Sequence, residues 1–251
     1  MSTLQQRTAL ITGGNSGIGL STAKLFKDSG ATVIITGRNE SSLLDAASEL
    51  GVKGYVSDQA DLAAINKLAA DIKTQFGTLD IIFLNAGIAS FSPFDQATEA
   101  HFDEIININL KGVFFTLQKL LPLLNAGGSV IFNTSINASV GMPNSAVYAA
   151  SKAALISLNR VLAMELSPRK IRVNCISPGP VETPVYEKLG LNEEEVTAFG
   201  KILSEKILLK RFGQADEIAQ LALFLASGAS SFITGTEIII DGGLTVNPVI
   251  N

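Results

Sequence analysis

The sequence is poor in the residues that build disulfides and metal centres. Its 251 residues include one cysteine, Cys175, one histidine, His101, and no tryptophan. A single cysteine cannot form an internal disulfide, which is typical of a protein of the reducing cytoplasm. A structural zinc site needs several such ligands, so neither zinc nor another metal is predicted. Cys175 lies in an apolar run, and we interpret it as a buried strand residue rather than a nucleophile.

Long apolar runs and an excess of positive charge are also missing. No run approaches the roughly 20 apolar residues of a membrane-spanning helix, and residues 1–7 do not look like a signal peptide. We therefore expect a cytoplasmic protein. The formal net charge is −4, whereas nucleic-acid-binding domains usually carry a basic patch. Neither a nucleic acid nor a membrane is expected as a partner.

Apolar material is abundant, because 47% of the residues are hydrophobic. Short β-rich runs alternate with helical stretches, and no linker or charge block separates two halves, so we predict one domain over residues 1–251. Residues 185–210 look irregular or partly helical. The expected strands are 8–12, 32–36, 54–56, 79–84, 129–133, 171–176 and 237–240, and the expected helices are 17–29, 40–50, 62–76, 98–124, 146–166 and 215–226.

Most of these strands are continuous apolar runs, so both of their faces should be covered. Strands that alternate with helices in this way predict an α/β fold: a single-domain, Rossmann-like, doubly wound parallel sheet of about seven strands with helices on both faces. Such sheets bind ligands beyond the carboxyl ends of their strands. The polar motifs of this chain directly follow those ends.

A glycine-rich turn, residues 12–19, follows the first strand and reads Thr-Gly-Gly-Asn-Ser-Gly-Ile-Gly. Glycines let the backbone turn tightly and approach a pyrophosphate, and the next helix offers its free N–H groups. The third glycine of the G-x-G-x-x-G pattern is replaced by Thr22. From this turn alone, a tight strand–helix connection is the alternative to dinucleotide binding.

Further motifs, in a fixed order, make the chain resemble the short-chain dehydrogenases/reductases. After the turn come Asn85-Ala86-Gly87, Asn109, Ser135 with Tyr148-x-x-x-Lys152, and Pro178-Gly179-x-x-x-Thr183. The resemblance covers essentially the whole chain, although Leu84 stands where the family often has asparagine. It implies a nicotinamide cofactor held by Gly13, Asn15, Ser16, Gly17, Ile18, Gly19, Arg38, Asn39, Asp58, Gln59, Asn85, Ala86, Gly87, Tyr148, Lys152, Pro178, Gly179, Val181 and Thr183.

The end of the second strand bears on the choice of cofactor. NAD-preferring sites usually place an acid there for the ribose 2′-hydroxyl, but this strand ends in Gly37-Arg38. A guanidinium can pair with a 2′-phosphate, so we expect NADP(H) to be preferred over NAD(H). The alternative is a solvated arginine in a surface turn. Asp58 resembles the family's adenine-binding acid, assisted by the Gln59 backbone, with capping of the next helix as the alternative.

Tyr148 and Lys152 are four residues apart in a helical pattern, so they share one face. A phenol with a pKa of about 10 is poorly matched to neutral pH. We expect the ammonium, and the charge of an oxidised nicotinamide, to lower that pKa. Tyr148 then exchanges a proton with the substrate oxygen while hydride moves at carbon. Alone, such a pair more often only packs or faces solvent.

The resemblance also implies that Lys152 binds the nicotinamide ribose, Ser135 orients the substrate oxygen, and Asn109 kinks its helix and holds a relay water. Residues 185–210 resemble the family's substrate lid. The expected substrate contacts are Ser135, Asn137, Val140, Asn144, Tyr148 and Tyr186, with walls from Phe91, Phe94, Val181 and Val185. These mostly apolar residues predict a small uncharged ketone, aldehyde or secondary alcohol.

The sequence thus predicts an oxidoreductase that moves a hydride between NADP(H) and a small carbonyl or alcohol. A sugar dehydrogenase of the glucose type and a 3-oxoacyl-carrier reductase are alternatives, because the family uses one catalytic set on many substrates. An inactive NADP-sensing protein is a more remote one. A homotetramer is expected from the family, with the two long helices and the last strand as contacts, and the apolar tail 244–250 either at an interface or on its own core.

Overall fold

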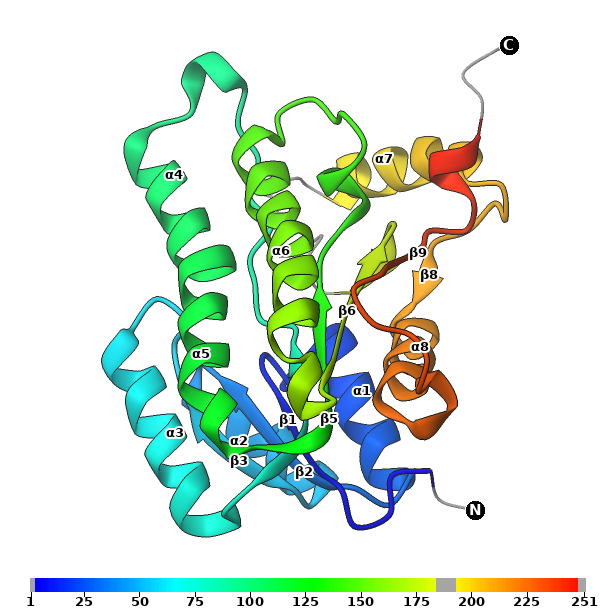
Figure 1. Ribbon diagram of the computed structural model, residues 1–251. Coiled ribbons are helices and arrows are strands. Elements are labelled where there is room, and N and C mark those ends of the chain that lie inside the picture. Colours follow the sequence, from blue (N-terminus) through cyan, green and yellow to red (C-terminus); the bar gives the residue numbers. More distant parts are fainter. Residues whose placement is uncertain (1–2, 184–192, 248–251) are drawn as a thin grey trace.

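Seven parallel strands lie side by side at the centre of the structure (Figure 1). The computed structural model describes residues 3–183 and 193–247, with side chains in the second range from residue 200 onward. The strand order is β3-β2-β1-β4-β5-β6-β9, which confirms the predicted α/β class. The strands are β1 (Thr8–Ile11), β2 (Thr32–Gly37), β3 (Lys53–Val56), β4 (Leu79–Leu84), β5 (Leu124–Asn133), β6 (Arg172–Pro178) and β9 (Glu237–Ile240).

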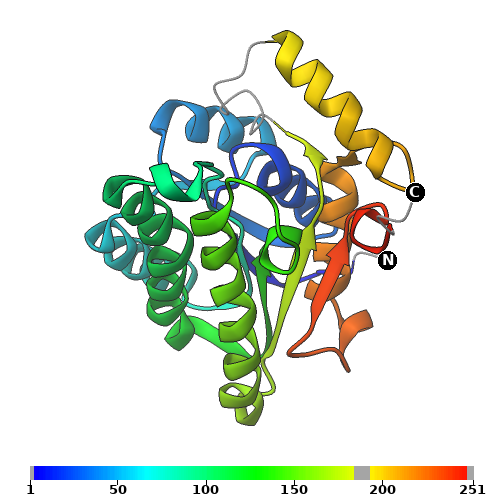
Figure 2. The same cartoon turned by 90° about the horizontal axis from the view of Figure 1, so that it is seen from above.

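Helices cover both faces of the sheet, as the apolar strands require. Side chains alternate along β1, so Leu10 packs into a cluster with α3, α5 and α6, whereas Ala9 and Ile11 pack with α1, α2 and α8. Figure 2 shows α7 outside these two layers. The helices are α1 (Gly17–Asp28), α2 (Glu40–Leu50), α3 (Leu62–Phe76), α4 (Glu99–Ile106), α5 (Val113–Leu120), α6 (Ala146–Glu165), α7 (Glu193–Lys206) and α8 (Ala215–Ala226).

The long helix predicted over residues 98–124 is not a continuous α-helix. A π-helical segment, Asn107–Gly112, separates α4 from α5. At its end the backbone packs directly on the loop before α3, because a Cβ on Gly112 would lie 2.1 Å from the backbone oxygen of Gln59. Apolar periodicity cannot reveal such a widened turn, which is frequent near functional sites. The periodicity thus predicted the helix but not its irregularity, whereas the resemblance implied a kink at Asn109.

β5 begins five residues earlier than predicted, at Leu124. Leu79 pairs with Leu124 and Ile81 pairs with Ser129, so the register with β4 shifts between these two pairs. The turn-forming residues 125–128, which predicted only the end of a helix, instead form a bulge within the strand. Their glycines and asparagine are compatible both with the end of a helix and with a bulge in a strand, and only pairing with β4 decides between the two.

A second, two-stranded sheet was not predicted. β7 (Val181–Glu182) pairs in parallel with β8 (Gly213–Gln214), and α7 lies between them in the chain. Each strand has only two residues, which is too short for a periodic signal. No helix within the described ranges is both long and apolar enough to cross a membrane.

Candidate active site

The glycine turn forms a tight cradle at the carboxyl end of β1. Gly13 and Gly17 have φ values of +63° and +51°, which disfavour residues with a Cβ. A Cβ on Gly19 would lie 2.0 Å from the Gly13 oxygen. No side chain caps the N-terminus of α1, and no acid lies in its first turn. Its free N–H groups and positive dipole end therefore suit the pyrophosphate of a dinucleotide.

Asn85, which directly follows β4, fixes this turn. Its side-chain Nδ2 donates to the backbone oxygens of Thr12 at 3.0 Å and Gly13 at 3.2 Å. The backbone N–H groups of Asn85 and Ala86 both donate to Thr12 Oγ1, each at 3.0 Å. The predicted Asn85-Ala86-Gly87 motif thus holds the cradle in place, and its placement against the glycine turn follows from the pairing of β1 with β4.

Tyr148 and Ser135 meet at the carboxyl edge of the sheet. Ser135 follows β5, and its side chain is hydrogen-bonded to the half-buried phenol of Tyr148 in the first turn of α6. Phe91 packs edge-on against the tyrosine, with ring centroids 5.7 Å apart and an interplanar angle of 73°. The predicted serine–tyrosine pair and one predicted apolar wall are therefore brought together.

The pKa of the Tyr148 phenol is shifted in the direction opposite to the one expected from Lys152. Burial raises the pKa of Tyr148 above its ordinary value, and the hydrogen bond with Ser135 opposes that rise only in part. The ammonium lies 5.7 Å from the phenol ring centroid, and it donates instead to the backbone oxygen of Asn133 at 2.9 Å. The prediction that the protein's own ammonium lowers the pKa of the phenol is thus wrong here, because loss of solvent outweighs it.

Lys152 is itself 5% exposed. Burial lowers the pKa of its ammonium to about 8, since a buried site disfavours the charged form. At neutral pH the side chain still carries a proton, and its Nζ lies close to Gly87, where an added Cβ would be 3.4 Å away. A cation at this place can hold hydroxyl groups of a bound cofactor next to the phenol.

Asn109 lies inside the π-helical segment and is completely buried. Its Oδ1 accepts from Ile88 N at 2.8 Å, and its Nδ2 donates to Ile88 O at 2.9 Å and to Ser151 Oγ at 3.3 Å. The side chain therefore ties the loop after β4 to the long helix and to α6. The helix irregularity implied by the resemblance coincides with this residue.

Known proteins resemble this chain over nearly its whole length. A family profile described as enoyl-(acyl carrier protein) reductase matches residues 13–245. A 3-oxoacyl-[acyl-carrier-protein] reductase of Thermotoga maritima is 39% identical, and the match covers 97% of this chain and 99% of that protein. The chain belongs to the short-chain dehydrogenase/reductase family. It is therefore an oxidoreductase that acts on alcohol or carbonyl groups, in a family that uses NAD(P)(H).

Two further relatives extend the likeness to other substrates and to solved structures. A D-threitol dehydrogenase of Mycolicibacterium smegmatis is 34% identical over 97% of this chain and 94% of its own. A crystal structure described as a short-chain dehydrogenase/reductase, glucose/ribitol dehydrogenase, from Brucella melitensis superposes with a TM-score of 0.91. It is 34% identical and covers 96% of this chain and 98% of that one. Short-chain dehydrogenases/reductases with different named substrates thus share this fold.

At the end of β2, this short-chain dehydrogenase/reductase has a basic side chain without a partner among the described residues. Arg38 is exposed and forms no hydrogen bond or ion pair with another described residue. Asn39, also predicted to contact the cofactor, instead caps α2 by accepting from Ser42 N at 3.0 Å. Gly37 packs against Asn15, because an added Cβ would lie 2.8 Å from the Asn15 Oδ1. The end of β2 therefore presents a basic group, and Gly37 contributes no carboxylate there.

The residues after β3 exclude one of the two roles considered for Asp58, the capping of the next helix. Asp58 does not cap α3: its Oδ1 accepts from Ala60 N at 2.9 Å, and Asp61 is the capping residue, accepting from Ala63 N at 2.8 Å. The two aspartates are three positions apart, and the sequence alone did not separate their roles. Gln59 is buried, and its Oε1 accepts from Thr116 Oγ1 at 3.0 Å.

The residues expected around the substrate are only partly gathered. Asn137 is 9% exposed beside Ser135, donating its N–H to the Ser135 Oγ at 3.2 Å, and Val140 is 38% exposed. Asn144 is exposed, with a φ of +65°. Of the expected walls, Val181 packs into the core at β7 and Phe94 is 84% exposed, and the role of both as walls stays a prediction. Val185 and Tyr186 lie outside the described residues, as does the first part of the expected lid.

Of the cofactor residues predicted from the motif after β6, Thr183 lies next to the cradle. A Cβ on Gly17 would be 3.3 Å from Thr183 Cγ2, so Thr183 borders the start of α1. Gly179 packs against Asp241, where an added Cβ would be 2.7 Å from the aspartate Cβ. Pro178 is the last residue of β6. The motif therefore joins the glycine turn to the C-terminal segment.

Asn133 is a site residue that the sequence did not reveal. Its backbone oxygen accepts from Lys152 Nζ at 2.9 Å, and its Nδ2 donates to Asn85 Oδ1 at 2.8 Å. Its own Oδ1 is buried without a partner among the described residues. The signal was a polar residue that ends an apolar strand directly before Thr134-Ser135. Such a position lies at the ligand-binding edge of a parallel sheet.

Cys175 contributes no reactive thiol to this site. No group of three or more His, Cys, Asp or Glu side chains in the described ranges is arranged to hold a metal ion. Cys175 is completely buried in β6, which agrees with the expectation for this residue. Burial raises the pKa of its thiol to about 12, so the thiolate is not populated at neutral pH.

Proposed function

We propose that this protein transfers a hydride between NADP(H) and a small ketone, aldehyde or secondary alcohol, with Tyr148 as the general acid and base. The observation that carries the proposal is the position of the Tyr148 phenol. It is hydrogen-bonded to Ser135 and has Lys152 within 5.7 Å of its ring, at the same sheet edge as the glycine cradle. These residues fit a nicotinamide cofactor, which supplies or accepts the hydride when bound.

The protein's own groups place the substrate oxygen and move its proton. Ser135 and Tyr148 each carry a hydroxyl, and together they can hold one carbonyl oxygen between them. In reduction, Tyr148 Oη gives its proton to that oxygen, and in oxidation the phenolate takes it back. Burial favours the neutral phenol, which is the form needed for reduction. The hydrogen bond between Ser135 and Tyr148 lowers the pKa of the phenol in part, and so favours the phenolate that remains.

The preference for NADP(H) is supported by the end of β2. The exposed guanidinium of Arg38 is free to form charge-assisted, fork-like hydrogen bonds with a 2′-phosphate. Gly37 leaves out the carboxylate that would repel that phosphate. The test is kcat/KM measured with NADPH and with NADH. Preference for NADPH, reduced at least ~tenfold by Arg38→Ala, is expected, whereas a clear preference for NADH would contradict the assignment.

Exchange of Tyr148 for phenylalanine tests the catalytic assignment. We expect Tyr148→Phe to keep its fold and its affinity for NADPH but to lose kcat by about 10²–10⁴-fold, the usual contribution of a general acid. Tyr55→Phe is the matched control, because its buried hydroxyl has no partner among the described residues and lies on β3, outside the catalytic pair. Near-normal turnover of Tyr148→Phe would rule out the proposed role.

Two other substrate classes are favoured by named relatives. The carrier-protein reductase supports a 3-oxoacyl thioester, and the threitol and glucose/ribitol dehydrogenases support a sugar or sugar alcohol. A panel of small ketones, polyols, glucose and 3-oxoacyl thioesters, followed by NADPH absorbance, separates them. We expect the highest kcat/KM on a small ketone, because Phe91 is 42% exposed and packs edge-on against Tyr148, which brings apolar surface to the catalytic pair. No turnover on any substrate would favour a cofactor-sensing role.

A homotetramer in a reducing cytoplasm is also part of the proposal. Apolar side chains are exposed on the elements expected at subunit contacts, and Val246 in the tail is 71% exposed rather than packed on its own core. Light scattering after gel filtration tests the assembly, and a monomer at micromolar concentration would contradict it. The exposed apolar residues on α4, α5, α6, α8 and β9, and in the loop between the last two, are Phe102, Phe114, Val161, Met164, Phe224, Phe232 and Ile239.

A further inference from the structure

A cavity of about 290 Å³ lies at the edge of the sheet opposite to the catalytic pair. Its walls include the first residues of two central strands, Ser129 at the start of the regular pairing of β5 and Arg172 at the start of β6. Ile81, near the start of β4, contributes an apolar wall. The glycine turn and Tyr148 follow the carboxyl ends of strands, so this cavity is separate from the hydride-transfer site.

The charge of this cavity differs from that of the whole protein. Its lining contains three basic side chains, Arg7, Lys170 and Arg172, and one acid, Asp80, although the chain carries a formal net charge of −4. The acid does not balance all three cations. Its Oδ1 accepts from Arg7 Nη1 at 2.9 Å and from Asn125 Nδ2 at 3.1 Å, and its Oδ2 accepts from Thr8 N at 2.9 Å.

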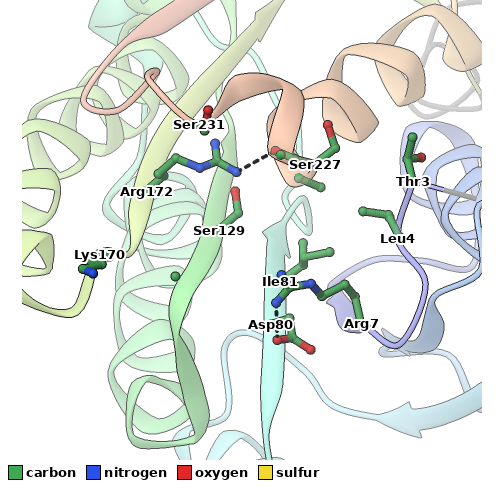
Figure 3. A pocket seen from close by; sticks show the side chains of 13 residues that line it. Thr3, Leu4, Arg7, Asp80, Ile81, Ser129, Lys170, Arg172, Ser227 and Ser231 are labelled. Carbon is green, nitrogen blue, oxygen red and sulfur yellow. Dashed lines mark hydrogen bonds and ion pairs between the residues drawn. The ribbon is translucent and has the colours of Figure 1, made fainter.

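Arg172 is a partly buried cation without an anionic partner. Its Nη1 donates to Ser230 Oγ at 2.8 Å and its Nη2 donates to the Ser227 backbone oxygen at 3.1 Å, both neutral groups. It forms no ion pair with another described residue. A guanidinium has five N–H donors, so these two bonds leave others available. Figure 3 shows Arg172 on one side of the cavity, directed to Ser227, and Arg7 on the other, directed to Asp80.

Further donors surround the same space. The Lys170 ammonium forms no hydrogen bond or ion pair with a described residue, and the side chain of Ser231 is likewise unpaired and exposed. Partly buried charges are normally matched by a counter-ion. We propose that this cavity binds a small oxyanionic metabolite, a phosphate ester or a polycarboxylate, through Arg172 and Lys170.

Calorimetric titration of the NADP⁺-saturated enzyme tests the proposal. Inorganic phosphate and citrate are the two probes, each at constant ionic strength. Saturable binding of one molecule per chain to either probe at concentrations below ~10 mM is expected, and the tighter of the two indicates the source of the oxyanion. Prior saturation with NADP⁺ blocks the cofactor's own phosphate sites, so that binding there is not mistaken for binding here.

Variants locate the binding. Lys170→Gln and Arg172→Met should each weaken it at least ~tenfold, whereas Lys24→Gln, which removes an exposed lysine of α1 outside the cavity, should leave it unchanged. Because Arg172 also holds the end of α8, Lys170→Gln carries the test if Arg172→Met does not fold. Absence of saturable binding, equal binding in Lys170→Gln, or equal loss in Lys24→Gln would each overturn the proposal.

Discussion

Substitution of one helical glycine should show how the π-helical segment is held against its neighbour. In Gly112→Ala the added Cβ would lie 2.1 Å from the Gln59 oxygen, 2.8 Å from its carbonyl carbon and 2.9 Å from its Cβ. Two of these atoms belong to the backbone, so the loop or the helix has to move. Overpacking of this kind costs about 1–3 kcal/mol or more, and the better helix propensity of alanine returns only about 1 kcal/mol.

We therefore expect a net loss of roughly 1–2 kcal/mol, which lowers Tm by about 2–8 °C for a chain of this length. Gly200→Ala is the control, because it is also a glycine within a helix but an added Cβ meets nothing within 4 Å. It should raise Tm slightly, by about 1–3 °C. Thermal unfolding followed by circular dichroism at one scan rate measures both. Equal or opposite shifts would refute the packing explanation.

Three further changes have defined outcomes. Gly37→Asp should shift the cofactor preference towards NADH. The shift should be larger when Gly37→Asp is combined with Asn15→Ala, because the new side chain otherwise meets Asn15 Oδ1 at 2.8 Å. An equal ratio of kcat/KM for NADPH and NADH in the single and double variants would contradict this reason. For Lys152, whose folded pKa of about 8 is below its ordinary 10.5, the unfolded chain binds more protons between these values. The free energy of unfolding, relative to Lys152→Met, should therefore rise with pH across this window, and a flat difference in urea titrations would exclude it. For Asp80, burial alone would raise the pKa of the carboxyl, but hydrogen bonds from Thr8, Asn125 and Arg7 lower it. The wild type should lose stability relative to Asp80→Asn as pH falls below about 4, and a constant difference would contradict that.

The sequence predicted most of the fold because apolar runs and helical periodicity depend on local patterns. All seven strands of the main sheet were found, and the bounds of α2, α3 and α8 match the prediction. What failed depends on contacts between distant segments. The bulge in β5 is decided by pairing with β4, and the close approach of Gln59 to Gly112 leaves no trace in the periodicity of the long helix.

The candidate site was predicted to a similar extent: local motifs were informative, whereas properties set by contacts between distant segments were not. Motif spacing placed Ser135 and Tyr148 correctly next to each other, because both lie at the carboxyl edge of one sheet. The pKa of the phenol could not be inferred, since it depends on how much solvent the surrounding chains remove. The burial of Val181 also depends on β7, a strand of two residues that leaves no pattern in the sequence.

The two asparagine amides between the ammonium and the nucleotide turn have a consequence for kinetics. Lys152 donates to the Asn133 backbone oxygen, the Asn133 side chain donates to Asn85, and the Asn85 side chain donates to the Gly13 oxygen. We therefore expect a disturbance at either end to change the positions of groups at the other. Turnover and cofactor affinity should consequently vary together in variants of these residues, so that neither quantity alone reports on a single step.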